Sequence, residues 1–298
     1  MGRTQLRKPE HYAVTTILLL GKDGQVGWEL QRSLAPLGEL TAWGRQQCDL
    51  ADLASLRDQV RSLAPDVIVN AAAYTAVDRA ETDAQRAFRI NAEAPGILAQ
   101  QAARRDAWLV HYSTDYVFDG EKAGPYREED SPNPLSVYGA SKLAGERAIA
   151  QSGCRHLIFR TSWVFAARGG NFAKTILRLA GEPEQLRVIA DQVGAPSSAE
   201  LIADVTALCL YRIAQAASEK TRSGLYHLSA AGETSWYDYA RFLLETARGM
   251  GVALLCPPGG IEPIPATAYP VAARRPVNSR LDTAKLRQTF GLHLPPWQ

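Results

Sequence analysis

The stretch VYGASKLAGE, residues 137–146, contains a tyrosine and a lysine four positions apart, Tyr138 and Lys142. On a helix, this spacing puts both side chains on one face. A tyrosine can donate the proton to a carbonyl that is being reduced, and a neighbouring ammonium lowers the pKa of the phenol toward neutrality. The pair therefore predicts acid catalysis beside a hydride donor, although a half-buried tyrosine next to a surface lysine gives the same pattern by chance.

A second group of polar side chains, Ser113, Thr114 and Asp115, lies in HYSTDYVFDG at the end of an apolar run. In an open α/β sheet, ligands bind outside the carboxyl ends of the strands. A hydroxyl group at this edge can hydrogen-bond the substrate oxygen beside Tyr138. This context favours the catalytic interpretation of Tyr138 and Lys142 over a chance pattern.

The run ILLLGKDGQVGWEL, residues 17–30, changes from branched apolar residues to three glycines, Gly21, Gly24 and Gly27, and then to an amphipathic pattern. A strand, a tight turn and the start of a helix are predicted. Because glycine has no Cβ, backbone N–H groups at such a turn can approach a pyrophosphate. A purely structural turn is the alternative, and the position at the first strand of the series favours a dinucleotide site.

The end of the second predicted strand reads AWGRQQ and carries Arg45 with no carboxylate. In dinucleotide enzymes an acidic residue there holds the ribose 2′-OH, whereas an arginine accommodates a 2′-phosphate. Arg45 therefore favours NADPH, with NADH as a second option, unless it is simply a solvated surface arginine. Asp49 and Leu50, in CDLAD, are expected to flank the adenine.

Alternating strands and helices must position these residues. After the first strand, apolar runs predict strands at residues 39–43, 66–70, 107–113 and 156–162. Such alternation is typical of βαβ units, so the expected fold class is α/β, a Rossmann-type doubly wound parallel sheet. Further helices are expected at 200–215 and 236–248, the latter with Thr234 or Ser235 as N-cap.

The alternation weakens after about residue 165, where proline and glycine become frequent. We therefore expect three parts. Residues 1–16 form a loose N-terminal extension, and residues 17–165 form mainly the dinucleotide-binding domain. Residues 166–298 form mainly a smaller C-terminal substrate-binding lobe, with some segments returning to the sheet.

Composition disfavours several classes of protein. The chain has 298 residues, with 33 lysines and arginines against 31 aspartates and glutamates, so its net charge of +2 gives no field that would attract nucleic acid or an acidic membrane. The four cysteines are far apart without a zinc pattern and are expected to be reduced packing thiols. The N-terminal residues lack an apolar segment of secretory length, so a cytoplasmic protein with a small-molecule substrate is expected.

Together the motifs resemble those of the extended short-chain dehydrogenase/reductases and, within them, the dTDP-4-dehydrorhamnose reductases. The resemblance runs from about Ile17 to Gln298 and is carried by GKDGQVGWELQ, PDVIVNAAAYTAVDRAE, HYSTDYVF, VYGASKLAGE, FRTSWVF, DQVGAP and TAYPVAARRPVNSRLDT. It implies an NADPH-dependent oxidoreductase that reduces the C4 keto group of dTDP-4-dehydro-β-L-rhamnose. The product would be the nucleotide sugar dTDP-β-L-rhamnose, and the reaction the final step of its biosynthesis.

By position, the resemblance implies a catalytic triad of Thr114, Tyr138 and Lys142, with Tyr138 as general acid and Lys142 on the ribose of the cofactor. It also implies cofactor contacts at the pyrophosphate and toward the nicotinamide from Gly24, Gln25, Val26, Ala72, Ala73 and Tyr74. Some members have histidine at the position of Tyr74, so the chain departs mildly from the pattern there.

For the substrate, the resemblance points to Asp115 and Trp163 around the deoxysugar. An aromatic ring and a hydrogen-bond acceptor suit a hydroxylated ring with apolar faces, and plain core packing is the alternative for Trp163. Arg274 and Arg275 are candidates for the nucleotide diphosphate, because a guanidinium fork matches phosphate oxygens. A solvated pair of loop residues is the alternative for them.

The resemblance leaves metal and assembly open. The chain ends at LPPWQ, where similar reductases continue into one more amphipathic helix, and some relatives dimerise through a magnesium site. Glu29 and Glu200 match part of that site, but Mg²⁺ needs convergent oxygen ligands, so we predict no metal ligands and leave Mg²⁺ and a homodimer open. Two other functions also stay open: a reductase for another dTDP-deoxysugar, and a non-catalytic Rossmann regulatory subunit like that of methionine adenosyltransferase.

Overall fold

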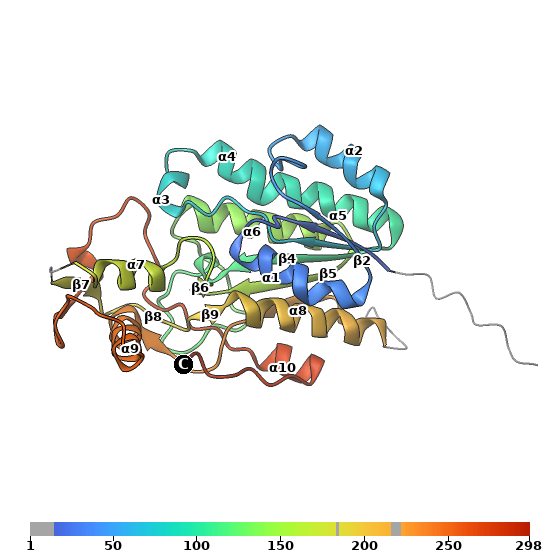
Figure 1. Ribbon diagram of the computed structural model, residues 1–298. Helices are drawn as coiled ribbons and strands as arrows, with labels where there is room; N and C mark the ends of the chain where they lie inside the picture. Colours follow the sequence, from blue (N-terminus) through green and yellow to red (C-terminus); the bar gives the residue numbers. More distant parts are fainter. Residues whose placement is uncertain (1–14, 183–184, 216–221) are drawn as a thin grey trace, which may run out of the picture.

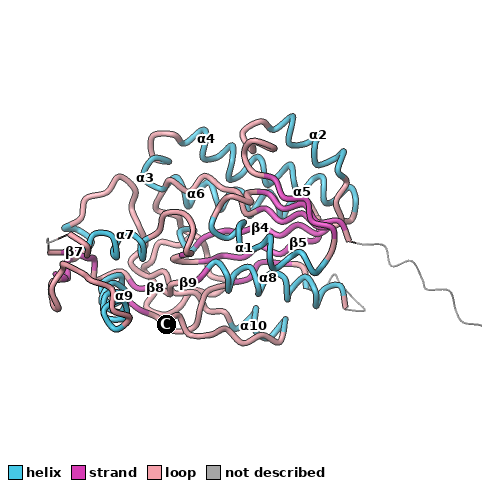
Figure 2. The backbone as a smooth tube through the Cα atoms, viewed as in Figure 1, coloured by secondary structure: helices cyan, strands magenta, loops and turns pink. Residues whose placement is uncertain are grey.

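The computed structural model describes residues 15–182, 185–215 and 222–298, and its centre is a six-stranded parallel sheet (Figures 1 and 2). Its strands are β1 (Thr16–Leu20), β2 (Glu39–Trp43), β3 (Val67–Asn70), β4 (Trp108–Thr114), β5 (Arg155–Thr161) and β10 (Gly224–His227). They lie in the order β10-β5-β4-β3-β1-β2. The chain passes from β1 out to β2 and returns to β3 on the other side of β1, so the topological switch point lies between β1 and β3.

Helices cover both faces of the sheet (Figure 1). One face is covered by α2 (Leu53–Leu63), α5 (Ala94–Arg105) and α6 (Val137–Gln151). The other face is covered by α1 (Gln25–Leu34), α8 (Ala199–Ala214) and α10 (Ala284–Phe290). Leu18 and Leu20 belong to the core on the first face, and Ile17 and Leu19 belong to the core on the second. Because both faces are buried, β1 is apolar throughout, and the predicted α/β fold is confirmed.

The connection from β3 to α5 is helical but irregular. It contains α3 (Val77–Ala80), α4 (Ala84–Phe88) and a π-helical turn over Arg89–Glu93. Single π-helical turns often occur at functional sites, and this turn packs against α6, which carries Tyr138.

A smaller lobe lies on the left in Figure 1. Its core is formed by α7 (Phe172–Leu179), α9 (Trp236–Gly249), β7 (Leu186–Ile189) and β12 (Ile261–Ile264). Two short strand pairs connect this lobe to the sheet region, namely β6 (Val164–Phe165) with β9 (Ser197–Ser198), and β8 (Val193–Gly194) with β11 (Thr234–Ser235). The lobe is therefore built from segments on both sides of α8 in the sequence.

Helix N-caps fix where the functional helices begin. The hydroxyl of Ser136 accepts a hydrogen bond from the Gly139 N–H at 3.2 Å and starts α6 just before Tyr138. Ser235 caps α9 in the same way through the Asp238 N–H at 2.9 Å, as predicted. The predicted extension over residues 1–16 lies outside the described residues, except for the last two, and β1 already begins at Thr16.

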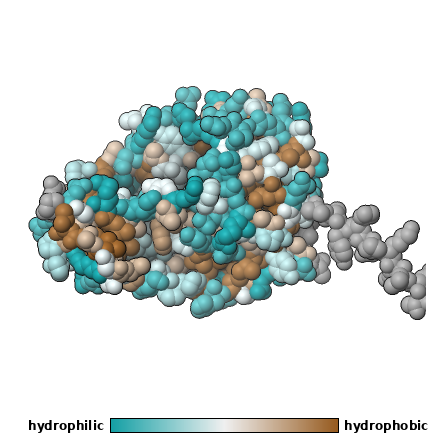
Figure 3. Space-filling model, viewed as in Figure 1, coloured by the Kyte–Doolittle hydropathy of each residue, from teal (hydrophilic) through white to brown (hydrophobic). Residues whose placement is uncertain are grey.

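The surface is mixed in character, with hydrophobic groups gathered over the α7–α9 lobe and along the edge near α8 in Figure 3. Exposed apolar side chains of the molecule include Leu208 and Tyr211 on α8. Within the described ranges, no helix combines the length and the apolar character needed to cross a membrane.

Candidate active site

A cleft of about 700 Å³ opens at the carboxyl ends of the strands, next to the switch point between β1 and β3. Turns after β1 to β4, helix α6 and the start of the smaller lobe form its walls. The predicted site residues that line this cleft are Gly21, Gly24, Gln25, Val26, Arg45, Asp49, Leu50, Ala72, Ala73, Thr114, Asp115, Tyr138, Lys142 and Trp163. Four predicted residues do not belong to its lining: Gly27, Tyr74, Arg274 and Arg275.

The glycine turn opens the first turn of α1 to the cleft. Gly24 is the N-cap residue, and no side chain caps the backbone N–H groups there. Gly21 has a φ of 84°, in the left-handed region that glycine tolerates. A Cβ at Gly27 would collide with the carbonyl oxygen of Gly21, so this glycine lets α1 begin directly against the turn. The uncapped helix N-terminus in the cleft fits a pyrophosphate group.

Arg45 is exposed where the cleft passes β2, close to Asp49 and Leu50. Asp23 also reaches this place, because a Cβ on Gly44 would collide with its carboxylate. A carboxylate therefore lies near the end of β2 after all, contrary to the sequence pattern. It comes from the β1–α1 turn rather than from β2, so the residues at the end of the strand gave no sign of it.

In the segment after β3, Tyr74 does not line the cleft, although Thr75 and Val77 do. Its hydroxyl donates to Asp83 at 3.2 Å, and its backbone N–H donates to the side-chain oxygen of Asn91 at 2.8 Å. Asn91 lies in the π-helical turn and also donates to the Tyr74 carbonyl and to the Ser141 hydroxyl, both at 3.0 Å. This buried asparagine therefore ties the segment after β3 to α6, and the sequence analysis did not single it out.

Tyr138 lies in the cleft beside Thr114. Burial raises the pKa of Tyr138 to about 12, and a hydrogen bond with Thr114 opposes this change. The direction is opposite to the one expected from the Tyr–Lys spacing, because burial disfavours the charged phenolate. A raised pKa keeps the phenol protonated at neutral pH, which is the state that a proton donor requires.

Lys142 is almost completely buried, with 2% of its surface exposed. Its Nζ donates to the carbonyl oxygen of Tyr112 at 2.6 Å and lies 3.1 Å from Nε2 of His111. Burial lowers the pKa of Lys142 to about 8, and the carboxylate of Glu146 opposes this change. Glu146 is itself paired with Arg160 at 2.6 Å. Lys142 therefore changes its charge close to neutral pH.

Asp115 follows Thr114 directly and is buried, with 3% of its surface exposed. Burial raises the pKa of Asp115 to about 6, against hydrogen bonds with Ser279 and Thr114 that lower it. The Thr114 hydroxyl donates to the carboxylate at 3.1 Å. Asp115 is thus an acceptor in the cleft that loses its charge below about pH 6.

An aromatic wall closes the side of the cleft next to the smaller lobe. The rings of Trp163 and Trp236 stack with their centroids 3.5 Å apart and an angle of 11° between their planes. Trp163 has a φ of 47°, which costs energy for a residue with a bulky side chain. Gly194 lies against the ring, since a Cβ there would be 2.6 Å from it. Trp163 therefore lines the cleft, and Trp236 joins it although the sequence marked it only as the start of a helix.

Arg275 lies at the edge of the cleft, in an ion pair with Asp78 of α3 at 2.7 Å. It also forms a hydrogen bond with Tyr116, which does line the cleft. Arg274 is exposed. The ion pair ties the loop before α10 to α3, and binding of phosphate by either arginine stays a prediction.

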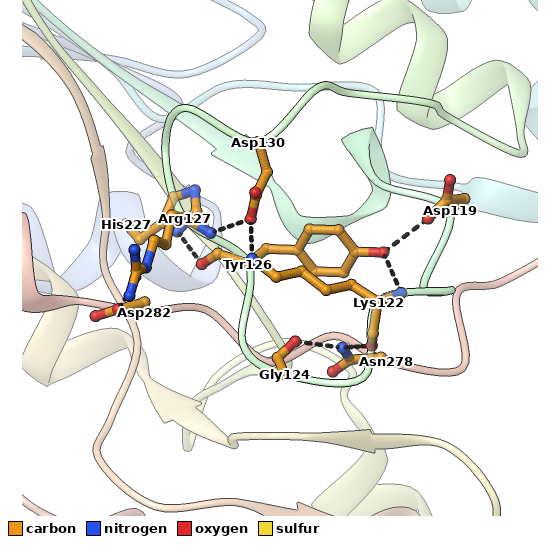
Figure 4. A network of polar contacts seen from close by, with 9 residues as sticks. All are labelled: Asp119, Lys122, Gly124, Tyr126, Arg127, Asp130, His227, Asn278 and Asp282. Atoms are coloured by element: carbon orange, nitrogen blue, oxygen red, sulfur yellow. Dashed lines mark hydrogen bonds and ion pairs between the residues drawn. The ribbon is translucent and has the colours of Figure 1, made fainter.

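A polar network connects the loop after β4 to the segment before α10 (Figure 4). The amide of Asn278 donates to the carbonyl oxygens of Lys122 and Gly124 at 2.7 and 2.9 Å. This contact fixes Ser279 beside Asp115, so two segments far apart in the sequence build one corner of the cleft. The other residues drawn in Figure 4 are Asp119, Tyr126, Arg127, Asp130, His227 and Asp282.

Comparisons with known proteins identify the family of the chain. The chain is 52% identical over 286 residues to the dTDP-4-dehydrorhamnose reductase of Escherichia coli K12, covering 95% of this chain and 94% of that protein. The corresponding reductase of Burkholderia thailandensis is 50% identical over 283 residues, with 95% of each chain covered. A family model described as the RmlD substrate binding domain matches residues 15–298. The chain belongs to the dTDP-4-dehydrorhamnose reductase (RmlD) family.

A solved structure extends the comparison to three dimensions. The RmlD-family reductase of Bacillus anthracis, crystallised in complex with NADP, superimposes with a TM-score of 0.85 at 30% identity and covers 96% of each chain. The resemblance predicted from the motifs is therefore confirmed, and the protein is an oxidoreductase of this family.

Glu29 and Glu200, the two acidic residues considered for a magnesium site, lie near Arg32 in this structure. Arg32 lies 3.8 Å from Glu29 and 2.8 Å from Asp204, and Glu200 is also close enough to raise its pKa. Among the described residues, no group of three or more histidine, cysteine or acidic side chains is arranged to hold a metal. The four cysteines are buried and free.

Proposed function

We propose that the protein uses NADPH to reduce the C4 keto group of dTDP-4-dehydro-β-L-rhamnose, giving dTDP-β-L-rhamnose. The observation that carries this proposal is the meeting, in one cleft, of an open helix N-terminus, the Thr114–Tyr138 pair and the Trp163–Trp236 wall. The names of the Escherichia coli and Burkholderia relatives support the substrate, and the NADP complex of the Bacillus protein supports the cofactor.

The start of α1 would hold the pyrophosphate of NADPH, and the bound nicotinamide would supply the hydride for the new C–H bond at C4. As the C=O π bond breaks, Tyr138 transfers its phenolic proton to the sugar oxygen, which becomes the C4 hydroxyl group. Thr114 hydrogen-bonds the phenol and orients it. Lys142 would hold the ribose of the cofactor, and Arg45 would contact its 2′-phosphate.

The sugar binds on the other side of Tyr138. Asp115 accepts hydrogen bonds from its hydroxyl groups, and the indole rings of Trp163 and Trp236 cover an apolar face of the ring. In this arrangement residues 17–165 hold mainly the cofactor, and residues 166–298 hold mainly the nucleotide sugar.

The direct test is the rate of NADPH oxidation with enzymatically generated dTDP-4-dehydrorhamnose, with the product identified by NMR. We expect turnover and dTDP-β-L-rhamnose as the product. Turnover confined to another dTDP-4-keto sugar would show a reductase with a different substrate. A folded protein that binds NADPH but turns over none of these sugars would show a regulatory subunit instead.

A further inference from the structure

Behind Lys142 lies a chain of buried polar side chains that the proposed reaction does not use. His111, on β4, is 1% exposed, and its Nε2 lies 3.1 Å from the Lys142 Nζ. Its other ring nitrogen, Nδ1, lies 3.1 Å from the amide nitrogen of Asn70, which is also 1% exposed. Asn70 is the last residue of β3, so three neighbouring elements, β3, β4 and α6, contribute one group each.

The orientation of the Asn70 amide follows from its second hydrogen bond. The backbone N–H of Ala72 donates to its Oδ1 at 3.2 Å, so the NH₂ group faces His111. An amide nitrogen only donates, and Nδ1 of His111 must therefore accept. Burial holds the pKa of His111 well below its usual value, and Lys142 lowers it further while Lys142 is charged. The ring is therefore neutral in either state of Lys142, and because Nδ1 accepts, the ring proton lies on Nε2.

This tautomer directs an N–H group at the Lys142 Nζ. An ammonium group also has only donors, so the contact at 3.1 Å is a hydrogen bond only when Nζ is an uncharged amine that accepts the proton of Nε2. The amine can still donate to the Tyr112 carbonyl at 2.6 Å. We propose that His111, in the tautomer fixed by Asn70, is a positioning residue that favours the uncharged form of Lys142 over the ammonium.

Burial acts on Lys142 in the same direction as His111, since it also favours the uncharged amine. Glu146, on the same helix, favours the ammonium, and its charge is balanced by Arg160 from β5 in a buried ion pair. Tyr138, one turn earlier on α6, is protonated at neutral pH and adds no charge. His111 on β4 therefore acts together with burial, and against Glu146, in favouring the neutral amine.

The consequence for catalysis rests on the proposed function. Tyr138 gives up a proton in each turnover and must regain one, and an ordinary lysine beside the cofactor would stay charged throughout. Because the pKa of Lys142 is lowered to about 8, its amine can gain and lose a proton near neutral pH. The charge beside Tyr138 can therefore change during the cycle.

Two NMR measurements on the full chain test the proposal without using activity. The first reads the tautomer of His111 from ¹⁵N shifts of the imidazole rings, and the chain has five histidines. The second follows the titration of Lys142 in protein labelled with ¹³C at lysine Cε, and there are seven lysines to resolve: Lys8, Lys22, Lys122, Lys142, Lys174, Lys220 and Lys285. We expect the Nε2–H tautomer of His111, and the Nδ1–H tautomer in the wild type would overturn the proposal.

Asn70→Asp reverses the hydrogen bond, because a carboxylate accepts from Nδ1 and leaves the Nε2 lone pair to accept from an ammonium. We expect the pKa of Lys142 to rise by about one unit or more in this variant. In the double variant Asn70→Asp/His111→Phe the rise should shrink, because the imidazole that transmits it is gone. An unchanged or lowered pKa in Asn70→Asp, or an equal rise without His111, would overturn the proposal.

If Asn70→Asp does not fold, the tautomer in the wild type decides the question by itself. Failure of the proposed function gives a different result, namely an Nε2–H imidazole and a depressed Lys142 titration in a protein that oxidises no NADPH with the sugar. The two proposals can therefore fail separately.

Discussion

The wall of the cleft beside the glycine turn and the wall beside the smaller lobe differ in how their residues are brought together. The first uses consecutive residues, Gly21 to Val26, and presents mainly backbone groups at the start of α1. The second combines side chains from distant segments, including Asp115, Trp163 and Trp236. Recognition by backbone needs only a local turn, whereas recognition by side chains depends on the whole fold. The two walls should therefore respond differently to substitution.

Tyr138→Phe removes the group at which the two walls meet, and it should have the largest effect on catalysis. We expect kcat to fall roughly 10²- to 10⁴-fold, because the sugar oxygen loses its proton donor. The affinity for NADPH should change little. Single-turnover oxidation of NADPH measures the first effect and fluorescence titration the second. Tyr226→Phe is the control, since it removes a hydroxyl group that donates to the Arg222 carbonyl away from the cleft. A kcat near the wild-type value would contradict the role of Tyr138.

Trp236→Ala tests the wall beside the smaller lobe. Loss of the stacked ring should raise KM for the nucleotide sugar about 10-fold and leave the Kd for NADPH unchanged, because an aromatic pair contributes roughly 0.5–1.5 kcal/mol beyond its buried area. Steady-state kinetics at saturating NADPH measures the change. Trp297→Ala serves as the matched control, because Trp297 packs on Tyr239 and Phe242 in the same lobe without lining the cleft. Equal effects of the two variants would mean that the lobe is merely destabilised.

The charge of Asp115 predicts that binding at the wall beside the smaller lobe depends on pH, whereas binding at the wall beside the glycine turn does not. Its pKa is raised to about 6, so the carboxylate takes up a proton as the pH falls through 6 and becomes a weaker acceptor. We expect KM for the sugar to rise on the order of 5-fold between pH 7 and pH 5, since a hydrogen bond to a charged group is worth about 1 kcal/mol more than a neutral one. In Asp115→Asn this dependence should disappear. If KM for the sugar still depends on pH in Asp115→Asn, another group causes the dependence.

Arg45→Ala should have the smallest effect, and it separates NADPH from NADH. Arg45 is exposed, so its contact with a 2′-phosphate is screened by solvent and worth at most about 1 kcal/mol. We expect KM for NADPH to rise about 3-fold to 5-fold with no change for NADH. Arg57→Ala, an exposed arginine on α2, is the control. Equal losses for the two cofactors would mean that Arg45 does not contact the phosphate.

The sequence predicted the wall beside the glycine turn almost completely. The strands and helices of the sheet follow local apolar runs and caps, and the turn over Gly21–Val26 is recognisable from its glycine spacing. The exception is Asp23, which reaches the end of β2 through space. Tyr74 also differs from the prediction that it contacts the cofactor. It donates hydrogen bonds to Asn91 and Asp83, which the local sequence does not indicate.

The other wall could be predicted only in part. Trp163 and Asp115 lie in recognisable motifs, but Trp236 stacks on Trp163 across a long stretch of sequence, and no local pattern marks such a pair. The raised pKa of Tyr138 could not be predicted from spacing either, since its largest cause is burial. Effects of burial on charge require the three-dimensional environment.

The central claim is that both walls serve one reaction, in which hydride reaches the sugar carbon next to Tyr138. The most direct test uses NADPH carrying deuterium at the reactive position of the nicotinamide, with dTDP-4-dehydrorhamnose as the substrate and NMR analysis of the product. We predict that one of the two stereoisomers of this NADPH transfers its deuterium to C4 of dTDP-β-L-rhamnose. A product without deuterium from either stereoisomer, or with deuterium at a different carbon, would contradict the account.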